Sequence, residues 1–149
     1  MSLMSTDKPQ SLYQALGGKP TLEKVHKIFY DKIYKHPWIK QYFEGTPQHI
    51  IESQQTDFMT TSMGGPEVYQ GKFPNPAHKH MNITEELFDL RQALLKKSLE
   101  EANVPRELAI KWLKIDAAFR KGLVKESLAD CEKRYATDHI LNFHNPVAS

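Results

Sequence analysis

Long hydrophobic runs are missing from this sequence, which excludes one class of protein at the start. No stretch approaches the roughly 20 consecutive apolar residues that a helix needs to cross a bilayer. The N-terminus also lacks a charged start followed by an apolar stretch, so no secretory signal is expected. We therefore expect a soluble, cytoplasmic protein with no membrane partner.

Cysteine is almost absent, because Cys131 is the only one among 149 residues. A lone cysteine has no intramolecular partner, which excludes both a disulfide framework and a metal site built from several thiolates. A reducing compartment suits such a chain, in agreement with the expected cytoplasmic location.

Neither sign of charge dominates the sequence. Twenty Lys and Arg residues stand against eighteen Asp and Glu, and the formal net charge of +2 is spread without a basic block. Nucleic-acid-binding domains usually carry a clustered basic patch, so no nucleic-acid partner is expected. A small neutral ligand is the partner that this charge distribution favours.

Hydrophobic residues are plentiful, at 40% of the chain with 10% aromatic, which is enough for one compact core. They recur every three to four residues without convincing two-residue alternation, and this pattern predicts an all-α fold. Breakers and capping residues divide the pattern into five helices. The first helix is expected to end at Gly17 and Gly18. The second is expected from Pro20 to Pro37 and the third from Thr46 to Gly64. The fourth is expected to begin at Thr84, and the fifth to run from Pro105 to Leu123.

A segment rich in helix breakers separates the third and fourth predicted helices. Residues 64–76 contain three glycines and three prolines, so we expect a loop there, and loops of this length are commonly functional. Of the seven histidines, only His78 and His80 come directly after this loop, since His139 and His144 lie in the tail. A histidine near a helix start is most often solvated or capping, so the position alone assigns no role.

The chain is expected to form one domain, over residues 10–126. Residues 1–9, which include a second methionine at Met4, are interpreted as a leader added for expression or as a disordered leader. Residues 127–149 are interpreted as a helical extension that ends in a loose tail. The charged segment from Lys125 to Arg134 either continues the last helix or breaks from it.

Six motifs follow one another between residue 11 and about residue 123 with almost no gaps. They are SLYQALGG at 11–18, IFYDKIYKHPWIKQYF at 28–43, QTDFMTTSMGGPEVYQGKF at 55–73, AHKHMNIT at 77–84, FDL at 88–90 and ANVPREL at 102–108. In this order the sequence resembles the truncated haemoglobins, especially their first group. The resemblance implies an all-α, two-over-two helical sandwich around one haem b.

The resemblance also implies roles for individual residues. His78, the histidine of the AHK motif, would bind the iron as a neutral imidazole and leave the opposite axial position free for a diatomic gas. His80, the one rival ligand, is then expected on the surface. Tyr30 and Gln55, with Gln54 beside them, would donate hydrogen bonds to bound O2. Without the resemblance, Tyr30 would be read as a core aromatic and the glutamines as a solvated helix edge.

Aromatic and basic residues complete the site that the resemblance implies. Phe43 matches the phenylalanine that packs on the porphyrin, and Phe58 and Phe88 are expected to extend that wall. Lys79 is expected to pair with a haem propionate, and Lys72 is a second candidate. Helical spacing does not distinguish core packing from cofactor contact, so each of these phenylalanines also has a plain core interpretation.

Arg91 departs from the family pattern, which usually has a small apolar residue at this position. An unpaired buried guanidinium costs several kcal/mol. Arg91 therefore swings outward, reaches a propionate or the distal ligand, or belongs to an altered pocket.

Taken together, these residues predict a haem-binding globin that reversibly binds O2 or another diatomic gas. Oxidation of nitric oxide by O2 is the enzymatic role that the resemblance includes. It would need an external reductase, because no G-x-G-x-x-G motif is present. The alternative is a haem-free, globin-like sensor or interaction domain with its pocket filled by side chains, and Arg91 favours this alternative.

Overall fold

Helices make up the regular structure of residues 10–146, which are the residues that the computed structural model describes. In chain order they are α1 (Leu12–Leu16), α2 (Lys19–Ile33), η2 (Ile39–Phe43), α3 (Gln48–Ser62), α4 (Pro74–His78), α5 (Glu85–Glu101), α6 (Arg106–Ala117), α7 (Arg120–Leu123) and η3 (Leu128–Asp130), where η denotes a 3-10 helix. This confirms the all-α prediction. The interpretation of residues 1–9 as a leader lies outside the described residues.

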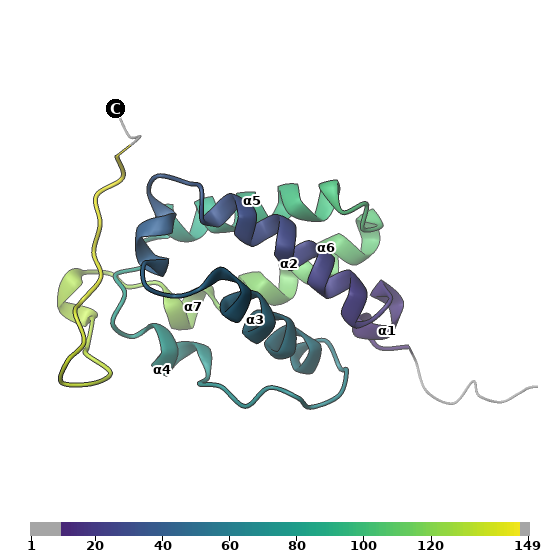
Figure 1. Cartoon of the computed structure of the whole chain (residues 1–149), viewed down its shortest axis with the longest axis horizontal. Coiled ribbons are helices and arrows are strands. Elements are labelled where there is room, and N and C mark those ends of the chain that lie inside the picture. Colours follow the sequence, from purple (N-terminus) through teal and green to yellow (C-terminus); the bar gives the residue numbers. More distant parts are fainter. Residues whose placement is uncertain (1–9, 147–149) are drawn as a thin grey trace, which may run out of the picture.

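Two helix pairs form the frame of the molecule (Figure 1). Helix α2 packs against both α3 and α5, and α5 packs against α6, so the pair α2–α3 lies against the pair α5–α6. The short helices α4 and α7 contact each other beside this frame. This arrangement is the expected two-over-two sandwich.

Capping residues set the helix boundaries that the sequence predicted. The Ser11 hydroxyl accepts a hydrogen bond from the amide of Gln14 at the start of α1. Gly17 ends the same helix with a φ of 105°, a left-handed conformation that glycine adopts without strain. The Thr84 hydroxyl accepts a hydrogen bond from the Leu87 amide, 3.1 Å away, and thereby starts α5.

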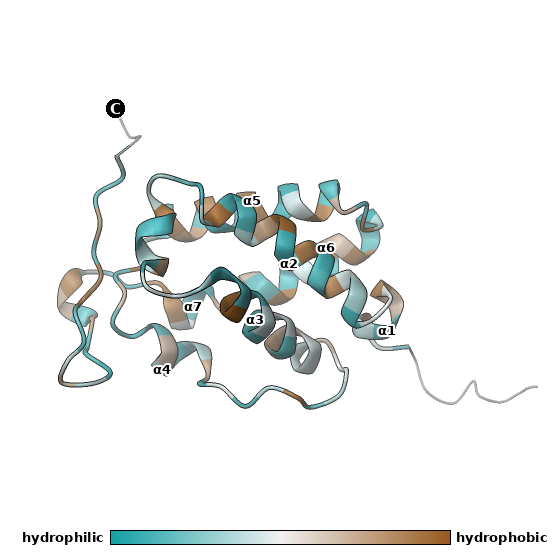
Figure 2. Ribbon diagram, viewed as in Figure 1, coloured by the Kyte–Doolittle hydropathy of each residue, from teal (hydrophilic) through white to brown (hydrophobic). Residues whose placement is uncertain are grey.

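The hydrophobic core lies where α2, α5 and α6 meet. Figure 2 shows hydrophobic and hydrophilic residues mixed along each of these ribbons, as expected for helices that bury one face. Residues with an exposed fraction of 2% or less include Leu22, Val25, Phe29, Ile33, Leu95, Leu99 and Trp112.

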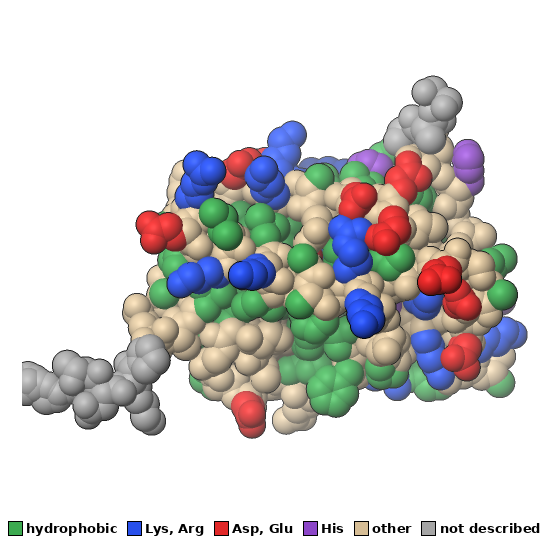
Figure 3. Space-filling model, turned by 180° about the vertical axis from the view of Figure 1, so that it is seen from behind, with side chains coloured by type: hydrophobic (Ala, Val, Ile, Leu, Met, Phe, Trp, Pro, Cys, Tyr) green, Lys and Arg blue, Asp and Glu red, His purple; other side chains and the backbone are tan. Residues whose placement is uncertain are grey.

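The outer surface mixes both signs of charge. On the face seen in Figure 3, acidic and basic side chains lie close together, with hydrophobic side chains between them. Within residues 10–146, the helices are too short or too polar for any of them to cross a membrane.

The last predicted helix is not continuous, and the expected helical extension after it does not form. Helix α6 ends at Ala117, and a turn separates it from α7. From residue 124 to 146 the only helix is the single 3-10 turn η3. The loop prediction for residues 64–76 also needs a correction, because α4 already begins at Pro74.

Long-range hydrogen bonds explain why the C-terminal segment, residues 124–146, is not helical. The Glu132 amide donates to the Lys79 carbonyl and the Leu141 amide donates to the His80 carbonyl, both at 2.8 Å. The Trp38 indole donates to the Phe143 carbonyl at 2.8 Å. Backbone groups that find partners elsewhere in the chain do not need the hydrogen bonds of a helix. The segment therefore lies along the end of the molecule, past α4 (Figure 1).

One histidine is buried inside the frame. His26 is 1% exposed, and its Nδ1 shares a hydrogen bond with the Thr56 hydroxyl, 2.7 Å away. The Trp112 ring contacts it edge-on, with ring centroids 5.6 Å apart. Burial, aided by the positive charge of Arg91, lowers the pKa of His26 from its ordinary 6.5 to about 3. His26 is therefore neutral in the folded protein at neutral pH.

This burial predicts a loss of stability in acid. The unfolded chain takes up a proton at His26 near pH 6.5, whereas the folded chain resists it until about pH 3. The contribution of neutral His26 to the free energy of unfolding is therefore complete above about pH 6.5 and falls by about 1.4 kcal/mol for each pH unit below that value. His26→Gln should flatten this slope of the unfolding free energy, measured by urea denaturation between pH 6.5 and 4. The exposed His49 provides the control, and equal slopes in wild type and His26→Gln would refute the prediction.

Candidate functional site

A cavity of about 280 Å³ lies between the α2–α3 pair and α4. Tyr30 of α2, Gln55 of α3 and His78 of α4 all line it. A smaller cavity of about 60 Å³ adjoins it, and the two share Phe43, His78 and Arg91 in their walls. The larger cavity is close to the lower end of the range of about 300–1,000 Å³ that is typical of small-molecule sites.

His78 ends α4, a helix of five residues that begins at Pro74. Its Nδ1 lies 2.7 Å from the Pro74 carbonyl oxygen, one turn earlier. A carbonyl only accepts, so Nδ1 carries the proton and donates it, which leaves a lone pair on Nε2. Burial lowers the pKa of His78 from 6.5 to about 4, so the ring is neutral at neutral pH. A neutral imidazole that is oriented through its second nitrogen is the usual form of a metal-binding histidine.

The donor set around His78 fits haem iron rather than a free metal ion. Among residues 10–146, no group of three or more His, Cys, Asp or Glu side chains could hold a metal ion. One imidazole beside an apolar cavity instead suits a metal whose other ligands come from a flat organic group. The apolar side chains of the larger cavity include Phe43, Ile51, Phe58, Met59, Phe119 and Leu123.

Tyr30 occupies the wall of this cavity that α2 provides. It is 4% exposed, and its ring packs edge-on against Phe29 and Phe43, with centroid distances of 4.8 and 6.1 Å. Burial raises the pKa of its phenol, so the hydroxyl keeps its proton. Gln54 and Gln55 line the same cavity, and Gln55 is the less exposed of the two. The structure therefore brings together the residues that the sequence proposed for the iron and for its ligand.

The phenylalanines that the sequence proposed as a porphyrin wall divide between the two cavities. Phe43 and Phe58 line the larger cavity, whereas Phe88, which is 1% exposed, lines only the smaller one. Phe58 also contacts Phe119, another residue of the larger cavity, with ring centroids 5.4 Å apart.

Of the two lysines that the sequence proposed for the haem propionates, Lys72 lines the cavity and Lys79 does not. Lys79 is absent from the residues that line either cavity, and its backbone carbonyl faces the C-terminal segment instead. Lys72 and Arg134 line the larger cavity and reach solvent, so they form its basic rim. Arg134 forms an ion pair with Asp138, with Nε and Oδ2 2.9 Å apart. Nothing in the sequence indicated Arg134, because it lies beyond the motifs.

His80 is not a surface residue, which corrects the sequence interpretation. Its exposed fraction is 4%, because the C-terminal segment covers it and Leu141 bonds to its carbonyl. His80 lines neither cavity. It therefore cannot take the place of His78 at the cavity wall.

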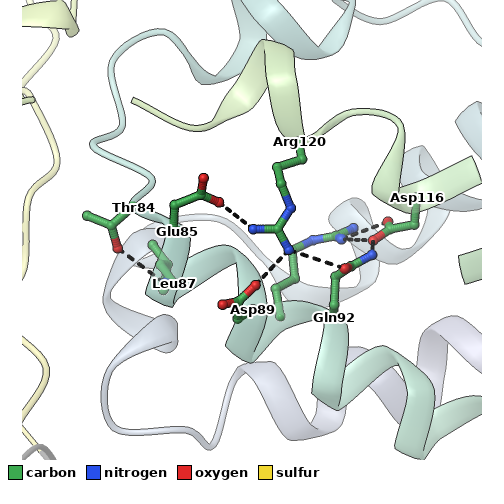
Figure 4. Close-up of polar contacts among 8 residues, drawn as sticks. Thr84, Glu85, Leu87, Asp89, Gln92, Asp116 and Arg120 are labelled. Carbon is green, nitrogen blue, oxygen red and sulfur yellow. Dashed lines mark hydrogen bonds and ion pairs between the residues drawn. The ribbon is translucent and has the colours of Figure 1, made fainter. Parts of the chain in front are cut away.

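Arg91 is paired inside the protein. Its Nη1 lies 2.7 Å from both carboxylate oxygens of Asp116, whose side chain is only 5% exposed. Gln92 donates to the same carboxylate at 3.2 Å, as Figure 4 shows. In the same view Arg120 reaches the carboxylates of Glu85 and Asp89. Arg91 therefore does not swing out into solvent, and its charge belongs to the cavity wall.

Lys125 fixes the end of α4. Its Nζ donates to the carbonyls of His78, Met81 and Leu123 at 3.2, 2.9 and 3.0 Å. An ammonium group has three donors, so all of them are used. No sequence pattern indicates this role, because the three acceptors are backbone atoms and two of them lie more than 40 positions away.

A two-over-two helical frame with one neutral imidazole beside an apolar cavity is the architecture of a globin, and comparisons with known proteins agree. The profile of the bacterial-like globin family matches residues 11–122. The chain is 33% identical to the group 1 truncated haemoglobin of Tetrahymena pyriformis over 118 residues, which cover 79% of this chain and 98% of that protein. It is 31% identical to the one from Mycolicibacterium paratuberculosis, covering 67% of this chain and 74% of that protein.

Solved structures give the same result. The Fe(III) form of the Tetrahymena pyriformis protein has a TM-score of 0.73 at 32% identity, covering 78% of this chain and all of that chain. The group II truncated haemoglobin from Bacillus anthracis shares the fold, with a TM-score of 0.69 at 20% identity, covering 80% of this chain and 94% of that chain. The chain therefore belongs to the bacterial-like globins, among the truncated haemoglobins, as the motifs predicted.

Replacing Lys125 tests the support of α4. Lys125→Met leaves three carbonyls without their donor, and hydrogen bonds to charged groups contribute roughly 1.5–3 kcal/mol each. We expect the free energy of unfolding in urea to fall by about 2 kcal/mol, since water replaces part of the loss. The exposed Lys121 of α7 gives the matched control, Lys121→Met. Equal destabilisation by both substitutions would show that Lys125 has no special role.

The assignment of His78 can be tested against its neighbour. His78→Ala should abolish stable haem uptake, or leave a site that added imidazole restores, because His78 lines the cavity and His80 does not. His80→Ala should retain haem, even if burial of His80 makes this variant less stable. Haem absorption of the purified variants gives the answer, and equal loss of haem from both would contradict the assignment.

Proposed function

We propose that this protein binds haem b through His78 and reversibly binds O2 or another diatomic gas on the Tyr30 side of the cavity. The observation that carries the proposal is that a neutral imidazole and a buried phenol line the same cavity. A bound ferrous haem would supply an iron with one open axial position. The names of the relatives, all truncated haemoglobins, support the proposal.

The Tyr30 hydroxyl is the main hydrogen-bond donor of this site. It makes no hydrogen bond to any residue between 10 and 146, so its proton is available to a ligand in the cavity. Because burial raises the pKa of the phenol, the proton stays in place at physiological pH. Gln55 provides a second donor from the neighbouring helix. Two hydrogen-bond donors in one cavity favour a small ligand that acquires partial negative charge, as O2 does on ferrous iron.

Oxidation of nitric oxide by O2 held in this cavity is the enzymatic form of the proposal. It would consume an electron each time the iron returned to the ferrous state. No G-x-G-x-x-G motif occurs in the sequence, so the electron would come from an external reductase.

The haem-free alternative is less well supported. It requires side chains to fill the space beside His78, whereas the structure has a cavity of about 280 Å³ there. Arg91, the residue that favoured the alternative, is paired with Asp116 and does not fill the cavity. The measurement of haem uptake separates the two functions directly.

Replacing Tyr30 tests the gas-binding side. Tyr30→Phe removes a charge-assisted hydrogen bond of roughly 1.5–3 kcal/mol, so O2 should leave at least about ten times faster. Carbon monoxide carries little negative charge when bound and should respond much less. Gln55→Leu should have a smaller effect, and the double variant should fall short of the product of the two, since both groups share one ligand.

Stopped-flow release of O2 and CO from the ferrous protein measures these rates. Tyr34→Phe is the matched control, because Tyr34 lies one helical turn away, outside the cavity, and donates to the Thr46 carbonyl at 2.8 Å. If Tyr30→Phe changes the O2 and CO rates in equal proportion, the tyrosine acts through the shape of the cavity and the proposed hydrogen bond is absent.

A further inference from the structure

We propose that His26 and Thr56 are positioning residues for Tyr30 and Gln55, the two hydrogen-bond donors of the site, and that the bond between them sets how long O2 stays bound. Neither His26 nor Thr56 lines the cavity that contains Tyr30. This inference rests on the proposed function, because the pair would act on the gas only through the two donors. It deepens that function by naming residues that hold the donors in place without touching the ligand.

The first observation is that a buried hydrogen bond joins α2 to α3. His26 Nδ1 and the Thr56 hydroxyl oxygen are 2.7 Å apart, and the two residues are 1% and 2% exposed. At this burial, water does not replace a lost partner, so the bond is costly to break. A hydrogen bond also restricts distance and angle more strictly than an apolar contact does. The bond therefore fixes the alignment of α2 and α3 at the point where it joins them.

The second observation is that this bond lies next to a proposed donor on both helices. Tyr30 follows His26 by about one turn of α2, so the two side chains lie on the same face. Their rings are in contact, with centroids 6.2 Å apart and planes tilted by 46°. On α3, Gln55 directly precedes Thr56. A shift of α2 against α3 therefore moves the Tyr30 hydroxyl relative to the Gln55 amide.

A third helix keeps the His26 ring in this place. The Trp112 ring of α6 contacts it edge-on at a centroid distance of 5.6 Å, and Trp112 is itself 1% exposed. Because burial lowers the pKa of His26 to about 3, the imidazole stays neutral at pH 7 and keeps the same bond to the neutral hydroxyl. A change at Thr56 therefore alters the contact between a fixed imidazole and the phenol ring of Tyr30.

A second polar link between α2 and α3 lies near Tyr30 but at the surface. Gln48, at the start of α3, donates to the Asp31 carboxylate at 2.7 Å, and the Asp31 side chain is 41% exposed. Water can replace either partner there, so this link contributes little to the alignment of the helices. The alignment next to the cavity depends instead on the buried pair.

The test begins with Thr56→Val in the ferrous, haem-loaded protein, because this substitution removes the hydroxyl and nearly keeps the shape of the side chain. We expect O2 to leave roughly threefold faster, a smaller change than for Tyr30→Phe, since the phenol remains but its hydrogen bond is misaligned. Release of carbon monoxide should change much less. Thr56→Ser keeps a hydroxyl and should restore the wild-type O2 rate.

A spectroscopic measurement reports on the same donors. The infrared C–O stretch of the carbon monoxide complex responds to hydrogen-bond donors around the ligand. In Thr56→Val this band should move in the same direction as in Tyr30→Phe, and in Thr56→Ser it should return to the wild-type position. A loss of stability alone would not move the band.

Thr60→Val is the matched control. Thr60 is 4% exposed on the same helix, and its hydroxyl donates to the Thr56 carbonyl at 2.7 Å, so its bond stays within α3. This variant also loses a buried hydrogen bond, but it should leave the O2 rate and the C–O band unchanged.

A double variant keeps the inference testable if Thr56→Val does not fold, since that substitution leaves His26 Nδ1 unpaired in the core. His26→Leu with Thr56→Val replaces both polar partners by apolar side chains, which costs much less than removing one partner. It should also release O2 faster. In a Tyr30→Phe background the same double substitution should have a smaller effect, because the hydroxyl through which it acts is already gone.

The outcomes distinguish this inference from the proposed function. If Tyr30→Phe speeds O2 release but neither Thr56→Val nor the double variant does, the inference fails and the proposed function stands. Equal acceleration by Thr56→Val and Thr60→Val would also overturn it, since it would show a general loosening of α3. If Tyr30→Phe itself leaves O2 release unchanged, the proposed hydrogen bond is absent and the inference fails with it.

Discussion

The hydrogen bond from His78 Nδ1 to the Pro74 carbonyl sets the chemistry of the cavity, because it fixes both the tautomer and the direction of the imidazole. It depends on a helix of only five residues, none of which is fully buried. A helix this short is not stable by itself, because nucleation is unfavourable and few turns follow. The support comes from α7, which packs against it, and from Lys125, which binds the carbonyl of His78. The position of the imidazole is thus a tertiary property rather than a local one.

A second part of the cavity wall depends on a different constraint, the burial of the Arg91–Asp116 ion pair. Desolvating two charges offsets most of their attraction, so such a pair seldom adds to stability. What it does add here is a fixed positive group over the Phe29 and Phe88 rings, and Phe29 is itself in edge contact with Tyr30. The polarity of the cavity is therefore set by the charge pair and the phenol together, and its shape by the phenylalanines.

Sequence reasoning succeeded where one short segment contains the whole signal. The cap at Thr84 and the left-handed glycine at Gly17 are local features, and the structure has both. The partner of Arg91 was out of reach, because Asp116 is 25 positions away on another helix and no spacing rule joins them. His80 was expected on the surface because it lies two residues after the proposed iron ligand and would point elsewhere, and only the return of the C-terminal segment buries it. The roles of Lys125 and Arg134 depend on the same return.

The site therefore draws on two parts of the chain. Tyr30, Gln55 and His78 lie within residues 11–122, which match the globin family, whereas Lys125 and Arg134 lie beyond that match. In the C-terminal segment, Lys125 binds the end of α4 and Arg134 adds a positive charge to the rim of the cavity. Neither of them is among the hydrogen-bond donors proposed to meet the gas. Changes in this segment can therefore alter how firmly the imidazole and a cofactor are held without altering the groups that meet the ligand. The residues that support the proposed iron ligand from outside the family match are therefore separate from the residues proposed to meet the gas.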